Sequence, residues 1–140
     1  MNSWTLFAFG SAAFAALTAI FAKIGVSTIN SNLATFIRTV IIVGISAAVV
    51  TWRSEWMNFK EISGKTYLFL ALSAVATGLS WLCYYRAIQL GPVSKVAILD
   101  KLSVVLVVIF SVLFLKETLT LKLALGTLMI AFGILLCFSP

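Results

Sequence analysis

The sequence has no histidine, two cysteines, and only four acidic residues against ten basic ones in a chain of 140 residues. Without histidine, the chain has no imidazole for a proton relay and lacks the commonest metal ligand. Cys83 and Cys137 are too few for a disulfide framework or a metal cluster, and both fall inside apolar runs, where we expect them to pack. Since no nucleophile with a partner base and no phosphate-binding loop is present, the sequence predicts neither an enzyme nor a cofactor or metal site.

Apolar residues are abundant instead. Hydrophobic residues make up 62% of the chain, and its mean hydropathy is +1.15, whereas soluble domains contain about 45–50% apolar residues. A hydrocarbon core roughly 30 Å thick requires a helix of about 20 residues. Five apolar runs have about this length: Trp4 to Ala22, Leu33 to Trp52, Tyr67 to Leu90, Pro92 to Leu115 and Leu119 to Phe138. The sequence therefore predicts an all-α, multi-pass integral membrane protein with five transmembrane helices in one domain over residues 1–140.

The segments between these runs are short and favour lipid over nucleic acid as a partner. The longest of them, Arg53 to Thr66, is too small for a nucleic-acid-binding domain. We therefore interpret the net charge of +6 as contact with anionic lipid. The same segment mixes both charge signs with Trp56 and Phe59, a composition typical of a turn at the headgroup level.

Two short links predict helix ends. Gly91 suits the C-terminal cap of the third helix and Pro92 the first position of the fourth, which predicts a tight antiparallel hairpin. Thr118 or Thr120 is expected to cap the fifth helix.

Positively charged residues hardly distinguish the two sides of the membrane. The side that carries the N-terminus has Arg53, Lys60, Lys65, Lys116 and Lys122. The other side has Lys23 and Lys95, with Arg38 and Arg86 within about one or two turns of the interface. If all of these count, insertion in both orientations is permitted. If Arg38 and Arg86 are buried, a cytoplasmic N-terminus is weakly favoured.

The feature that points most directly to function is a pair of charges, Asp100 and Lys101, inside the fourth apolar run. A charge in the bilayer core costs roughly 2.5–3.5 kcal/mol on insertion scales, and it often marks a path or a site for a polar solute. Because neighbouring helical residues point about 100° apart, we expect that these two cannot simply neutralise each other. Arg38 is the expected counter-ion of Asp100, and Ser103 lies near the Asp100 side. The alternative is a fixed ion network that only specifies helix packing.

The second helix carries a narrow polar arc. Thr35, Arg38, Thr39 and Ser46 fall within it, so the arc is expected to face protein or water. The alternative is that Arg38 extends to the interface from its position near the helix start.

Aromatic and hydroxyl side chains share one side of the third helix. Thr77, Trp81 and Tyr84 are expected to line a cavity there and to hold a cation against the rings. The alternative is that the aromatic residues near the helix end anchor the interface, as we expect for Arg86 on the opposite side.

Several short matches extend over nearly the whole chain. They are Ala87 with the Gly91 turn, the long fourth helix, the turn at Lys116 and Glu117, Gly126 with Gly133 in the last helix, and the segments AKIG and FIRT in the first two helices. Together they resemble the EamA repeat of the drug/metabolite transporter superfamily. Members of that superfamily typically hold two such repeats in inverted orientation, with ten helices around a central substrate cavity. A single repeat of five helices implies an antiparallel homodimer with dual topology, since inverted repeats form the site at their interface.

The resemblance implies a secondary transporter of the bacterial inner membrane that moves a small polar or charged metabolite or drug by alternating access. We expect the site to include Asp100, Lys101, Arg38, Trp81, Tyr84, Ser103 and Thr77, with Asp100 as a candidate carrier of a coupling proton. The family commonly has uncharged residues and a proline in the fourth helix, so its cavity chemistry is not carried over to these positions. The competing hypothesis is a membrane scaffold, or one subunit of a lipid or lipid-linked-sugar flippase.

Overall fold

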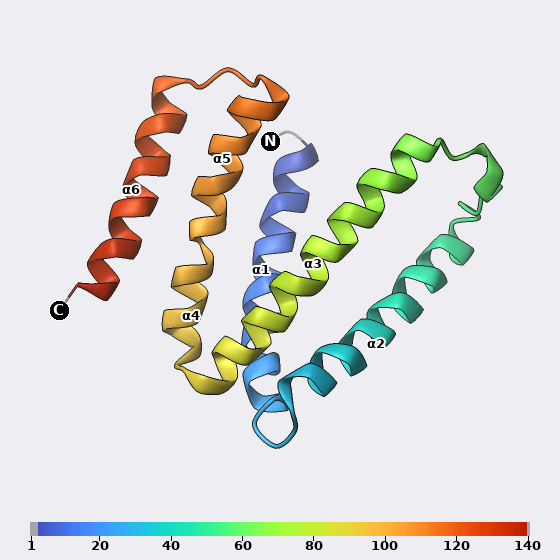
Figure 1. The fold of residues 1–140 in the computed structure, drawn as a ribbon, viewed down its shortest axis with the longest axis horizontal. Coiled ribbons are helices and arrows are strands. Elements are labelled where there is room, and N and C mark those ends of the chain that lie inside the picture. The colour runs from blue at the N-terminus through green and yellow to red at the C-terminus, as the bar shows by residue number, and fades with distance from the viewer. Residues whose placement is uncertain (1–2, 140) are drawn as a thin grey trace. The chain divides into compact units, whose positions relative to one another are not determined.

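The computed structural model describes residues 3–139 and separates into two compact units. The N-terminal unit comprises Met1–Leu90, and the C-terminal unit comprises Gly91–Pro140. The two units are drawn together in Figure 1 and are described one at a time below. The third and fourth helices belong to different units, so their predicted antiparallel packing stays a prediction.

The prediction of an all-helical membrane protein with five spans is confirmed. Five helical segments of the described residues are long and apolar enough to cross a membrane, and each lies within a few residues of its predicted bounds. They run over Ser3–Gly25, Ser31–Trp52, Gly64–Leu90, Val93–Leu115 and Leu121–Phe138. The fourth differs from the expected continuous helix because it is interrupted at Lys101.

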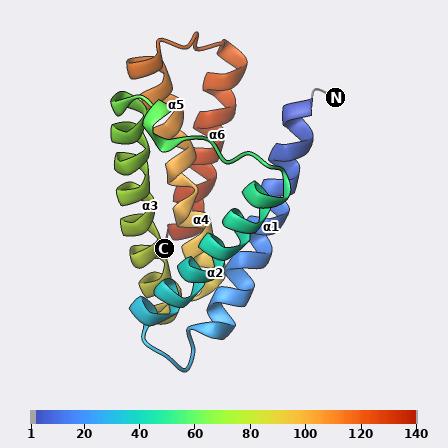
Figure 2. The same cartoon turned by 90° about the vertical axis from the view of Figure 1, so that its right-hand side faces the viewer.

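Three of these spans form the N-terminal unit. They are α1 (Ser3–Gly25), α2 (Ser31–Trp52) and α3 (Gly64–Leu90), with the short 3-10 helix η1 (Phe59–Glu61) before α3. The helix α3 packs against both α1 and α2, as Figures 1 and 2 show from two directions.

Close packing in this unit is concentrated where α1 ends, α2 begins and α3 ends. The buried residues there are Ala22, Val26, Ser31, Ala34, Thr35, Tyr85 and Ile88. Side chains also cross between the elements: Lys23 donates to the carbonyl of Ile88, and the Gln89 amide donates to the carbonyls of Val26 (3.3 Å) and Ile29 (3.0 Å). These bonds satisfy carbonyls that the helix ends and the loop leave free, so this end of the unit is fixed by polar contacts as well as packing.

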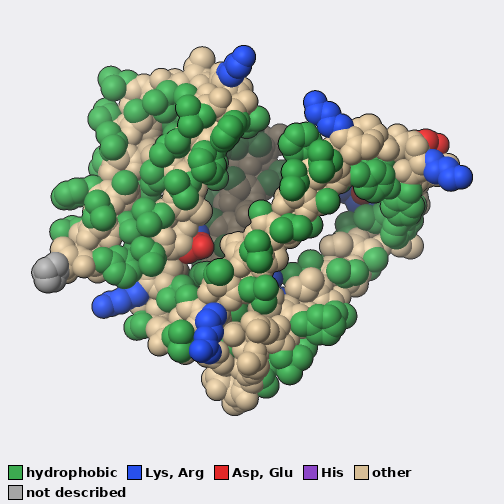
Figure 3. All heavy atoms as spheres, in the orientation of Figure 1, with side chains coloured by type: hydrophobic (Ala, Val, Ile, Leu, Met, Phe, Trp, Pro, Cys, Tyr) green, Lys and Arg blue, Asp and Glu red, His purple; other side chains and the backbone are tan. Residues whose placement is uncertain are grey.

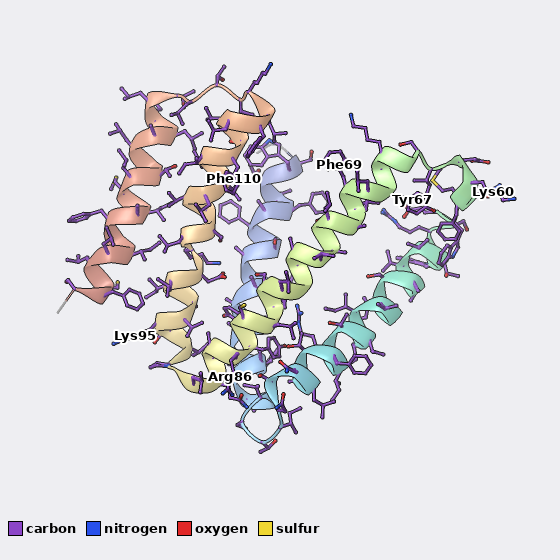
Figure 4. The ribbon with its side chains drawn as sticks, in the orientation of Figure 1. Lys60, Tyr67, Phe69, Arg86, Lys95 and Phe110 are labelled. Atoms are coloured by element: carbon purple, nitrogen blue, oxygen red, sulfur yellow. The ribbon has the colours of Figure 1, made fainter. Side chains whose placement is uncertain are left out.

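The segment between α2 and α3 is held by local contacts, and its position at the headgroup level stays a prediction. The Trp56 ring lies edge-on to Phe59, with 6.5 Å between ring centres, and the Trp56 indole donates to the Thr51 hydroxyl at 3.0 Å. The Tyr67 hydroxyl donates to the carbonyl of Phe59 at 3.2 Å. Figure 4 shows Lys60 and Tyr67 at this end of the unit and Arg86 toward the other end of α3.

The C-terminal unit contains α4 (Val93–Asp100), α5 (Leu102–Leu115) and α6 (Leu121–Phe138), with α6 packed against both others. At the break, Lys101 N–H donates to Ile98 and Val104 N–H donates to the Lys101 carbonyl, so the bonds span three residues. Such tightening within an otherwise regular helix often marks a hinge or a functional position.

The predicted helix ends are confirmed in part. Thr120 caps α6, because its hydroxyl accepts from Leu123 N–H at 3.2 Å. Pro92 stands one residue before its expected place and is the N-cap of α4, while Val93 opens the helix. Gly91 directly follows Leu90, the last residue of α3, as expected for a residue at the helix end. No described glycine has a positive φ, and Lys116 adopts the left-handed conformation at the end of α5 (φ 56°).

The surface matches a membrane setting. Hydrophobic side chains cover the shafts of the helices, and most of the visible Lys and Arg side chains lie near helix ends (Figure 3). Large apolar residues such as Phe7 and Phe14 are exposed. Exposure of these apolar faces to water would be unfavourable, so lipid or other protein must cover them.

Candidate functional site

Arg38 meets the aromatic residues of α3. It lies about 10 Å along α2 from Ser31, at about 1.5 Å per residue. Its guanidinium carbon is 3.5 Å from the centre of the Trp81 ring and 5.9 Å from that of Tyr85. A cation over an aromatic face is attracted by the ring's negative face, by about 2 kcal/mol or more where water is excluded. This contact holds Arg38 against a neighbouring helix, which favours the polar-arc interpretation over extension to the interface.

The rings beneath Arg38 support one another. Trp81 makes edge contacts with Tyr84, at 5.6 Å between ring centres, and with Tyr85, at 5.8 Å. Tyr85 is only 5% exposed. Because the phenol rings restrict the indole, the position of the guanidinium is set by packing on α3 as well as by its own helix.

A cavity of about 540 Å³ opens beside Arg38, entirely within the N-terminal unit. Its size is in the range typical of small-molecule sites. The lining residues are Thr18, Phe21, Ala22 and Gly25 of α1, Ile29 of the following loop, Ala34, Ile37, Arg38, Ile41 and Ile45 of α2, and Tyr85 of α3. The cavity thus has largely apolar walls with a single guanidinium among the described residues that line it.

Most hydroxyls near this cavity are already bonded within their own helices. Thr18 donates to the Phe14 carbonyl at 2.8 Å, Thr35 to Ser31 at 2.9 Å, and Thr39 to Thr35 at 2.8 Å. In the part of the chain that the structure describes, Arg38 forms neither an ion pair nor a hydrogen bond with another residue. Its N–H groups are therefore the strongest donors available at the cavity.

Not all predicted site residues gather here. Arg38, Trp81 and Tyr84 form one cluster, and the cation over the Trp81 ring is the chain's own Arg38. Of these three predicted residues, Arg38 lines the cavity described above and Trp81 and Tyr84 do not; their role in binding stays a prediction. Thr77 lies on the exposed surface of α3 and is not among the residues that line this cavity, so its place in a site stays a prediction. Ser103 is exposed in the first turn of α5.

Asp100 and Lys101 correct a second expectation. The Lys101 ammonium lies 3.7 Å from an Asp100 carboxylate oxygen, so the two neighbours do pair. The helix breaks between α4 and α5 at this point, so the separation of neighbouring side chains in a regular helix does not hold there. Both side chains remain well exposed, at 40% for Asp100 and 57% for Lys101. Asp100 and Arg38 belong to different units, so their predicted pairing stays a prediction.

Three contributors to this region were not predicted from the sequence. Tyr85 lies near the C-terminal end of α3, yet it is buried and lines the cavity. Its spacing of four from Trp81 was the available signal, because residues four apart share a helical face. Lys23 and Gln89 bond to carbonyls, for which the sequence gave no specific signal. Arg86 lies outside this cluster as expected, donating to Gln89 at 2.8 Å.

Comparison with known proteins gives a consistent result. Residues 2–139 match the model of the EamA-like transporter family. A curated protein from Sinorhizobium sp., described as an uncharacterized transporter in the cobO 3' region, is 58% identical over 135 residues, which cover 96% of each chain. No solved structure matches the chain.

Proposed function

This chain belongs to the EamA-like transporter family, and from that premise we propose that it is a secondary transporter that moves a small polar or charged metabolite by alternating access. Its five spans make it a multi-pass integral membrane protein. Family membership points to transport and not to catalysis.

The observation that carries the proposal is the cavity at Arg38. An apolar cavity with one fixed polar group is the usual form of a small-molecule site. Arg38 provides that group within a membrane-spanning helix, where an ionisable residue is by default a functional candidate. The Arg38 cavity, meaning the eleven lining residues given above, is therefore the proposed solute site.

The break between α4 and α5 is the proposed coupling element. Interrupted membrane helices in transporters place backbone groups and charges at ion and substrate sites. Asp100 lies at this interruption and pairs with Lys101. We propose that protonation of Asp100 releases this pair and couples solute movement to the proton gradient.

Two copies inserted in opposite orientations form the proposed working unit, in a bacterial inner membrane. Five spans place the two ends of a chain on opposite sides, and the loop charges hardly favour one orientation. Single cysteines introduced at Ser27 and Ser54, after replacement of Cys83 and Cys137, would report topology. Labelling of each site from both faces of the membrane by an impermeant maleimide is expected. Labelling of each from one face only would exclude this arrangement.

Uptake by the purified protein tests the transport function. Liposomes containing the full chain would be incubated with a mixture of small metabolites, and their contents measured by mass spectrometry against protein-free liposomes. At least one compound is expected to enter faster with the protein. If monodisperse protein admits nothing and copurifies with a different membrane chain, the scaffold or flippase-subunit hypothesis replaces this one.

A further inference from the structure

The charge of the Arg38 cavity restricts what can bind there. Among the described lining residues, Arg38 is the sole charged side chain, and no carboxylate lines the cavity with it. A cationic solute in this cavity would be repelled by the like charge of Arg38. An uncharged solute would leave the guanidinium without an ionic partner.

The stacking of Arg38 leaves its hydrogen-bonding capacity unused. The Trp81 ring contacts the guanidinium at 3.5 Å and accepts no conventional hydrogen bond from it. A guanidinium carries five N–H donors in a planar fork that fits two oxygens of a carboxylate or phosphate. The aromatic contact therefore orients the group and still leaves donors for an anion.

The side chains that line the cavity around Arg38 indicate what the remainder of the solute, beyond its anionic group, should be. Phe21, Ile37, Ile41 and Ile45 extend the lining from both sides of the cavity along α1 and α2. An apolar body would cover these side chains, while the Tyr85 phenol, which lines the same cavity, can donate a hydrogen bond.

From this geometry we infer that the Arg38 cavity binds amphiphilic organic anions, with a carboxylate or phosphate on the guanidinium and an apolar group against the α1 and α2 walls. This inference rests on the proposed transport function, because it names the substrate class of the same site.

Three probes of matched shape test the inference: benzoate, benzamide and benzamidinium, which differ mainly in charge. Isothermal titration of the purified full-length protein is expected to give benzoate an affinity at least about tenfold above those of the other two. Equal or tighter binding of benzamidinium or benzamide would overturn the inference, as would the absence of benzoate binding. This measurement needs no mutation, so it does not depend on whether a variant folds.

Substitutions of Arg38 test whether benzoate binds in the Arg38 cavity. Arg38→Gln is expected to remove the preference for benzoate, and Arg38→Lys to restore part of it, because an ammonium keeps the charge without the planar fork. The matched control is Arg86→Gln, since Arg86 is an exposed arginine at the end of α3. A preference for benzoate that survives Arg38→Gln, or is lost equally in Arg86→Gln, would refute the assignment to this cavity.

Two further experiments complete the test. The first distinguishes a lipid phosphate from a soluble solute as the bound anion, and the second tests the transport function separately from the anion site. Benzoate binding that is blocked in nanodiscs containing phosphatidylglycerol identifies a lipid phosphate as the occupant, whereas unaffected binding identifies a soluble solute; both support the inference. Uptake of radiolabelled benzoate and of radiolabelled benzamidinium, each measured as the excess over protein-free liposomes, tests transport separately. Benzoate binding without protein-dependent uptake would contradict the proposed function while the anion site stands, and protein-dependent uptake of benzamidinium alone would contradict the anion site while the proposed function stands.

Discussion

The two units of this chain hold charge in different ways. In the N-terminal unit, rings from α3 hold Arg38 beside a cavity, and its counter-charge is absent from the described lining. In the C-terminal unit, Asp100 and Lys101 lie side by side at a helix break and neutralise each other. The first arrangement leaves a cation ready for an external anion, whereas the second needs a proton or a new partner before either charge becomes available.

This difference suggests a division of roles. A cation stacked on an aromatic ring keeps its charge at every relevant pH, because the guanidinium is effectively always protonated. A carboxylate and an ammonium in contact can change state when a proton binds the carboxylate. The proposed solute site therefore lies in the N-terminal unit, and the proposed coupling element lies in the C-terminal unit.

Reversal of the charge at Arg38 gives the largest expected effect. Arg38→Glu should weaken benzoate binding by at least about 100-fold, since the attraction between the guanidinium and the benzoate carboxylate becomes repulsion between two carboxylates. The same variant should bind benzamidinium more tightly than the unmodified protein does. Titration of both probes measures the change. Unaltered benzoate binding in monodisperse Arg38→Glu protein would show that the charge at position 38 does not determine which solutes the cavity binds.

Removal of the carboxylate at Asp100 should separate coupling from recognition. Asp100→Asn is expected to abolish solute accumulation driven by a pH gradient in proteoliposomes and to leave benzoate affinity within about twofold. Glu117→Gln provides the matched control, because Glu117 is an acidic residue of the α5–α6 link, outside the helices. Undiminished pH-driven uptake would remove Asp100 from the coupling role.

Removal of the indole at Trp81 should have a smaller effect on recognition. Trp81→Ala deletes the ring under Arg38 and is expected to weaken benzoate binding by about 5–30-fold, corresponding to about 1–2 kcal/mol. Trp81→Phe keeps an aromatic face and should retain much of the affinity. Titration of both variants tests the contact, and equal losses in the two would assign the effect to packing alone.

The sequence predicted the spans well because membrane helices follow from length and hydropathy, which are local properties. It also named Arg38 and Trp81 as candidate site residues, since polar and aromatic side chains at helical spacing mark a common face. The structure brings the two into contact, and their functional role stays a prediction. The break at Lys101 was not predicted, because neither proline nor glycine marks it. The burial of Tyr85 depends on how α3 packs against its neighbours, and a helix read alone cannot reveal that.

The last comparison has the smallest expected effect and concerns single side chains near helix ends, one in each unit. Gln89 bonds to two carbonyls that are distant in sequence, whereas Thr120 caps its own helix. Thr120→Ala is expected to lower the free energy of unfolding by about 1 kcal/mol, which is typical of a lost N-cap. Gln89→Ala should cost more, about 1–3 kcal/mol, because part-buried carbonyls lose their partners. Unfolding in mixed micelles at increasing dodecyl sulfate measures both, with Thr127→Ala as the control for a hydroxyl that bonds only within its helix. A loss for Gln89→Ala no larger than that for Thr120→Ala would mean that the Gln89 bonds stabilise their unit no more than a local cap stabilises its helix.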